Sequence, residues 1–128
     1  MAYAELDELV GKKIKEIKGL EKESEEVRIF TEDGNEYLFY HPQDCCEQVN
    51  LNDFEMSSDT LVGGTVLSAE AVERDNEGEK PEGAESYTWT FYKIETDKGG
   101  LWMRWLGESN GYYSESVDFV WVNKPIVN

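Results

Sequence analysis

Positive charge is scarce in this sequence, and so are cysteine and histidine. There are 12 Lys and Arg against 28 Asp and Glu, which gives a formal net charge of −16. Attraction to DNA, RNA or anionic lipid depends on clustered Lys and Arg, so this balance argues against direct nucleic-acid or membrane partners. No apolar run approaches the roughly 20 residues of a membrane span. We expect a basic protein as the partner.

Cysteine occurs only twice, at the neighbouring positions Cys45 and Cys46. A disulfide between neighbours has to close across a single peptide unit, which strains the backbone. Two reduced thiols in a reducing compartment are therefore expected. The N-terminal segment has no basic stretch followed by an apolar one, so we expect a cytoplasmic protein of a bacterial host cell.

Aromatic residues are well represented, with four Trp, seven Tyr and five Phe within a hydrophobic share of 39%. Disordered acidic chains lack such residues, because they cannot bury enough apolar surface to fold. A chain of 128 residues is long enough for one core. We therefore expect a single domain over residues 1–128.

An internal repeat organises the sequence. The segment DELVGKKI at 7–14 is matched by DTLVGGTV at 59–66, at an offset of 52. Each match predicts a short helix that stops at a glycine and is followed by a strand. The helices are expected at residues 4–10 and 57–62, and the strands at about residues 12–20 and 65–73.

The spacing of Ile14, Ile17 and Leu20 departs from the period of two that a regular strand requires. It predicts a bulge in the first of these strands, or a helical stretch in its place.

A β-hairpin is predicted in each copy. Asp33-Gly34 is a turn signal between β-rich runs, and residues 87–105 repeat the pattern around Gly99-Gly100. A last strand follows at about residues 46–51 in one copy and 114–119 in the other. The additional residues at about 73–86 are acidic and predict an inserted mobile loop.

These elements predict an α+β fold that is mostly antiparallel β, with about eight strands and two short helices. A pseudo-two-fold axis would relate repeat 1, at about residues 4–54, to repeat 2, at about residues 57–122.

The loop at 41–47, HPQDCCE, contains the only His and both Cys of the chain. Structural zinc sites space their cysteines by two to four residues, so we expect no metal, and nothing suggests a cofactor. A nucleophilic Cys45 or Cys46 activated by His41, with Asp44 orienting the ring, is a possible arrangement. Such dyads usually assemble from distant segments, so an enzyme is not favoured. A recognition loop, or a thiol that simply packs in the core, remains open.

The loop at 107–115, GESNGYYSE, is rich in the residues that binding loops use. It is also a competent β-turn, so an ordinary turn remains an alternative. Equivalent loops of a duplicated fold often lie at the same end, so the two loops are expected to face one pocket. The candidate binding residues are His41, Gln43, Asp44, Cys45, Glu108, Ser109, Asn110, Tyr112 and Tyr113.

The two loop strings, together with TWTFY at 88–92, resemble a family of small uncharacterised proteins found in bacteriophages and bacterial genomes. The similarity runs from about Leu9 to Phe119. The resemblance implies no activity. It implies a phage or mobile-element context, in which small acidic proteins often inhibit host defence by binding.

Three functions follow as hypotheses. The first is a stoichiometric inhibitor of a basic, nucleic-acid-binding host defence protein, similar to anti-CRISPR or DNA-mimic proteins. The second is a module that binds or sequesters a small ligand with His41, Asp44, Asn110, Tyr112 and Tyr113. The third, an enzyme that uses His41 with a cysteine, ranks last. The oligomeric state is left open.

Overall fold

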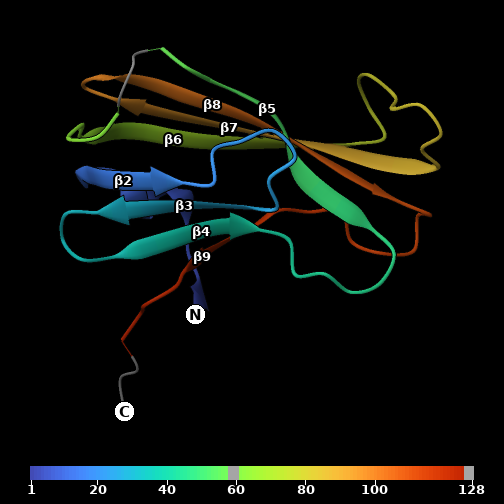
Figure 1. Cartoon of the computed structure of the whole chain (residues 1–128), viewed down its shortest axis with the longest axis horizontal. Coiled ribbons are helices and arrows are strands. Elements are labelled where there is room, and N and C mark those ends of the chain that lie inside the picture. The colour runs from blue at the N-terminus through green and yellow to red at the C-terminus, as the bar shows by residue number, and fades with distance from the viewer. Residues whose placement is uncertain (58–60, 126–128) are drawn as a thin grey trace.

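The computed structural model describes residues 1–57 and 61–125. Its strands form two antiparallel sheets that face each other as layers (Figure 1). One 3-10 turn, η1 (Leu6–Leu9), precedes the second strand. The strands are β1 (Ala2–Tyr3), β2 (Ile14–Lys18), β3 (Glu26–Thr31), β4 (Glu36–Tyr40), β5 (Gln48–Met56), β6 (Val66–Asp75), β7 (Ser86–Thr96), β8 (Gly99–Ser109) and β9 (Asp118–Trp121).

The two sheets exchange their last strands. The first sheet has the order β1-β9-β4-β3-β2, and the second has the order β5-β8-β7-β6. Strand β5, which ends the first half of the chain, therefore pairs with β8, and β9, which ends the second half, pairs with β4. Each half of the sequence completes the sheet of the other half.

Backbone hydrogen bonds join the sheets where β2 and β6 begin, and they occur in reciprocal pairs. Gly11 N donates to Val66 O, and Gly63 N donates to Ile14 O. Ile14 N likewise donates to Gly64 O, and Val66 N to Lys12 O. In each pair the second hydrogen bond joins the residues that correspond to those of the first bond in the other half of the chain. Corresponding residues are 52 positions apart, which is the offset of the sequence repeat. This is the pattern that a local two-fold axis between two related units produces.

The expected α+β class is wrong, because the fold is nearly all antiparallel β. The helix expected at 4–10 is only the four-residue turn η1. A segment this short is a poor helix former in isolation, and one 3-10 turn is enough to bury Leu9. Half of the helix expected at 57–62, residues 58–60, lies outside the described part of the chain. None of the described helical residues forms a segment long and apolar enough to cross a membrane.

The irregularity expected near Ile14 is present, because the register of β2 against β3 shifts between Ile14 and Glu16. The register of β6 against β7 shifts between Val66 and Ser68, again 52 residues later. The hairpin predicted at Gly34 is also present, and Gly34 has the positive φ of 89° that such a turn requires.

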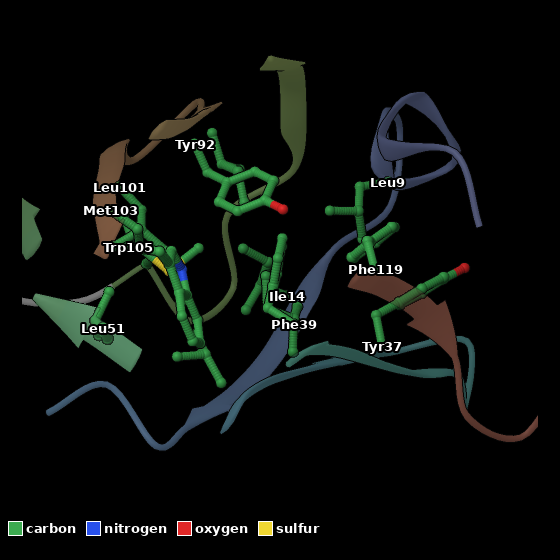
Figure 2. Close-up of a cluster of buried hydrophobic side chains, with 14 of the residues drawn as sticks. Leu9, Ile14, Tyr37, Phe39, Leu51, Tyr92, Leu101, Met103, Trp105 and Phe119 are labelled. Carbon is green, nitrogen blue, oxygen red and sulfur yellow. The ribbon is translucent and has the colours of Figure 1, made fainter. Parts of the chain in front are cut away.

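The core lies between the two sheets. Phe39 of β4 meets Tyr92 of β7 edge-on at a ring distance of 4.8 Å, and Trp105 of β8 is fully buried beside them (Figure 2). Leu9 from η1 and Phe119 from β9 close one side of this cluster (Figure 2). Alternate residues of β7 point into the core, as a strand of period two requires.

The outer face of β7 is covered in part by the loop between β6 and β7. The Trp89 indole Nε1 donates to the Glu79 carbonyl oxygen at 2.8 Å, and Ala84 packs in the same small cluster. The segment expected to be a mobile insertion is thus held against the sheet. On the same face, the Arg104 guanidinium lies 4.9 Å from the centre of the Trp89 ring.

Candidate functional site

Two crossovers carry the chain between the sheets. The first crossover, residues 41–47, leads from β4 to β5, and the second crossover, residues 110–117, leads from β8 to β9. They touch each other directly, because His41 Nδ1 lies 2.7 Å from the Ser116 carbonyl oxygen. The loops that the sequence places at equivalent positions therefore lie at the same end of the molecule (Figure 1).

The first crossover is built around the carboxylate of Glu47, which is 2% exposed. His41 Nε2 lies 2.9 Å from Glu47 Oε2, and the Cys45 backbone N–H donates to Oε1 at 2.8 Å. The Gln43 amide and the Asp44 backbone N–H donate to the same carboxylate. The hydrogen bond from His41 and those from backbone N–H groups outweigh the cost of burial and lower the pKa of Glu47 to about 2.

His41 links the two crossovers through both of its ring nitrogens. Nδ1 contacts the Ser116 carbonyl oxygen and Nε2 contacts the Glu47 carboxylate. The imidazole therefore contacts Glu47 and Ser116, whereas the third hypothesis needs it to contact a cysteine sulfur. Cys45 and Cys46 are joined to each other in a disulfide, which corrects the expectation of two reduced thiols.

The second crossover is built around Glu115, which is 8% exposed. The Thr88 hydroxyl donates to Glu115 Oε1 at 2.7 Å, and the Ser109 hydroxyl donates to Oε2. Ser109 precedes Glu115 by six residues, as His41 precedes Glu47, so the same construction is present twice with a different donor.

A cleft of about 550 Å³ opens beside the two crossovers, and we call it the crossover cleft. Five of the nine predicted binding residues line it, and they come from both loops. These are Gln43, Cys45, Glu108, Ser109 and Asn110. The cleft is also lined by Cys46, Glu47, Gln48, Gly83, Ala84, Glu25 and Glu85.

The remaining four predicted residues lie elsewhere around the crossovers. His41 and Asp44 line a separate cavity of about 440 Å³, and Tyr113 lines a third one of about 260 Å³. Tyr112 is 83% exposed and packs edge-on against Tyr113 at a ring distance of 5.1 Å. The single pocket expected from the sequence is therefore divided into neighbouring cavities.

The cleft is strongly acidic. The side chains of Glu25 and Glu85 are exposed and that of Glu108 is half-buried. Within residues 1–57 and 61–125, no Lys or Arg lies within 4.0 Å of any of these three carboxylates. Three carboxylates without a cation face a space that also offers amide groups from Gln43 and Asn110. Such a site attracts positive charge.

The sequence reasoning missed the two residues that organise the site, Glu47 and Glu115. A signal was available, because the alignment of the repeats places them opposite each other at an offset of 68. Glu25 and Glu85 were also missed, since each comes from a loop far from the crossovers in the sequence. Among the described residues, no three His, Cys, Asp or Glu side chains are grouped in a way that would hold a metal ion.

A family model described as a domain of unknown function, DUF7448, matches residues 7–119. The chain therefore belongs to this family. No curated protein and no solved structure matches the chain.

Proposed function

We propose that this member of the DUF7448 family is a stoichiometric binding protein that receives a basic segment of a partner protein in the crossover cleft. The observation that carries the proposal is the cleft itself, where Glu25, Glu85 and Glu108 have no Lys or Arg of the described residues within 4.0 Å. A Lys or Arg side chain of a partner would supply the missing charge and hydrogen-bond donors. The net charge of −16 would steer such a partner towards the molecule.

The biological setting belongs to the same proposal. The resemblance to phage and bacterial proteins supports a role in the cytoplasm of a bacterial host. Nucleic-acid-binding defence proteins have the basic surfaces that an acidic cleft would recognise. Occupying such a surface would inhibit the defence protein without any catalysis.

Capture of partners from a bacterial lysate tests the proposal, provided that two variants with equal charge are compared. The cleft variant combines Glu25→Gln, Glu85→Gln and Glu108→Gln. The control variant combines Glu21→Gln, Glu55→Gln and Glu70→Gln, which neutralises three exposed carboxylates outside the cleft. Both variants lose three negative charges.

The expected result is a basic protein that the wild type and the control variant retain and the cleft variant loses. Its retention should fall between about 50 mM and about 500 mM salt, because exposed charges are screened. Equal retention by the cleft variant, or retention that salt does not weaken, would remove the proposal.

A small cationic ligand is the second candidate, because a volume of about 550 Å³ is in the range of small-molecule sites. Native mass spectrometry of protein purified from the host cell would distinguish the two. A bound metabolite that the cleft variant lacks favours the ligand, and protein without added mass favours the protein partner.

A further inference from the structure

The sequence contains a single Asn-Gly pair, Asn110-Gly111, and it lies at the start of the second crossover. Both residues are exposed, and Gly111 has a positive φ of 91°. Asparagine followed by glycine is the pair most prone to form a succinimide, because glycine has no side chain to block the approach of its backbone nitrogen to the asparagine side chain. In this loop, neighbouring groups contact both of the atoms that would react.

The backbone nitrogen of Gly111 is the nucleophile of this reaction, and it has to lose its proton as it attacks. Its N–H donates to the Ser109 hydroxyl oxygen at 2.9 Å. The Ser109 hydroxyl donates in turn to the buried carboxylate of Glu115. A carboxylate behind a hydroxyl makes the hydroxyl oxygen a stronger base, so the chain of hydrogen bonds offers a path for the proton from Gly111 through Ser109 to Glu115.

The side-chain amide of Asn110 is the electrophile. Its Oδ1 accepts a hydrogen bond from the Tyr112 backbone N–H at 3.0 Å. This hydrogen bond folds the side chain back along the Gly111 peptide unit, which brings the amide carbon to the side of the nucleophile. Its donor also lies where negative charge develops on Oδ1 when the amide carbon is attacked, so it stabilises that charge.

From this arrangement we propose that Asn110-Gly111 is a self-modifying site, at which the asparagine loses its amide group. The Gly111 nitrogen forms a bond to Asn110 Cγ, and the bond from Cγ to Nδ2 breaks. Ammonia leaves with the proton that Gly111 gave up, which Ser109 returns to the departing nitrogen. Water then opens the succinimide at either carbonyl carbon and leaves aspartate or isoaspartate. The reaction consumes water alone.

The product carries a negative charge where Asn110 was neutral. Asn110 lines the crossover cleft together with Glu108, so the reaction adds a carboxylate to an already acidic cleft as the protein ages. An effect of this charge on a basic partner rests on the function proposed above. The reaction itself does not depend on that function and is measured without a partner.

The test compares the folded wild type with a synthetic peptide of residues 107–115 in the same mildly alkaline buffer. Peptide mapping by tandem mass spectrometry follows the conversion of the amide to the acid over time. We expect the folded protein to react at least about tenfold faster than the peptide, because the fold holds Ser109 and Glu115 in place. Asn76 is an internal control, since it is exposed but is followed by Glu77, and it should keep its amide group.

Variants test the path of the proton. Ser109→Ala removes the hydroxyl and should slow the reaction by about tenfold or more, whereas Ser109→Thr keeps a hydroxyl and should restore most of the rate. Ser114→Ala is the matched control, since that hydroxyl lies in the same crossover but accepts from the Ser116 backbone N–H, and it should react as the wild type does. Ser109→Ala also takes a donor from Glu115, so its fold is checked by circular dichroism. The comparison with the peptide decides the proposal without it.

Three outcomes would overturn the proposal. A rate in the folded wild type that is equal to or below that of the peptide would show that the fold only shelters the pair. Equal rates in a folded Ser109→Ala and the wild type would show that no proton passes through this hydroxyl. Conversion of Asn76 at the same rate would show a general property of exposed asparagines instead of a site.

Discussion

At the scale of single residues, two buried glutamates explain how the crossovers keep their shape. Glu47 gathers donors from its own loop, whereas Glu115 takes them from Thr88 of β7 and Ser109 of β8. Within the described residues neither carboxylate pairs with Lys or Arg. Loop composition does not predict such residues, because acidic side chains in loops are usually exposed. The sequence pointed instead to the rarer types around them, His41 and the two cysteines. Those residues do surround Glu47, so the region was predicted although its central residue was not.

Thr88 and Thr90 should respond differently to the same substitution. Thr88→Val removes the donor to Oε1 of the buried Glu115 carboxylate and leaves only the Ser109 hydroxyl on Oε2, and we expect it to lower the free energy of unfolding by about 1–3 kcal/mol. Thr90 Oγ1 has no hydrogen-bond partner among the described residues, so Thr90→Val should change stability by less than about 0.5 kcal/mol or raise it slightly. Urea unfolding of both variants measures the difference. Equal loss in both would contradict the assigned hydrogen bonds.

Acid should destabilise the first crossover through Glu47. Folding lowers the pKa of this carboxyl from 4.5 to about 2, so the ionised form is favoured in the folded state. The stabilisation is complete above pH 4.5 and is lost as the pH falls through about 2. Wild-type stability should therefore fall more steeply between pH 5 and pH 2 than that of Glu47→Gln. Urea midpoints measured across this range for both proteins give the comparison.

Asp33 affects both proteins in that experiment equally. Burial raises its pKa and the hydrogen bond from Lys12 lowers it, with a net value of about 2. Parallel curves for the wild type and Glu47→Gln would mean that Glu47 does not contribute.

At the scale of elements, local patterns predicted the strands and turns and failed on the helices. The turn at Gly34 and the bulge near Ile14 depend on neighbouring residues, which a sequence pattern can represent. The segment at 4–10 has helix-like spacing but is too short to be a stable helix by itself, so packing of Leu9 decides its form.

Gly107 is the glycine of β8 on which the second crossover most depends. A Cβ at this position would lie 2.3 Å from the Glu115 carbonyl oxygen, a backbone atom that cannot move alone. We expect Gly107→Ala to cost about 2 kcal/mol or more and to weaken binding in the crossover cleft.

Gly100→Ala is the control on the same strand, because there the Cβ would meet the flexible carboxylate of Glu95. Its cost should stay below about 1 kcal/mol. Thermal unfolding of both variants measures these costs. Similar losses at Gly100 and Gly107 would argue against a backbone clash.

At the scale of the whole molecule, the exchange of β5 and β9 could not be predicted from the sequence. Repeat analysis finds similar segments but not which of them pair, since strand pairing is decided by contacts far apart in the chain. The exchange has a consequence for function. It brings both crossovers to one place, and the crossover cleft exists only because the two halves are interlocked.

Neither half of the chain should fold by itself. A fragment of residues 1–57 contains β5 without β8, and a fragment of residues 58–128 contains β9 without β4. We expect each fragment to be unfolded by circular dichroism and an equimolar mixture to recover β structure. A cooperative thermal transition in either fragment alone would show that the exchange is not essential.

The central claim is that the crossover cleft recognises positive charge, and calorimetric titration with a hexa-arginine peptide tests it most directly. The wild type and the control variant with Glu21, Glu55 and Glu70 neutralised should bind with equal affinity. The variant with Glu25, Glu85 and Glu108 neutralised should bind at least about tenfold more weakly, because it loses the carboxylates that pair with the guanidinium groups. Equal affinity in the two triple variants would mean that only the net charge attracts the peptide, and it would contradict the account.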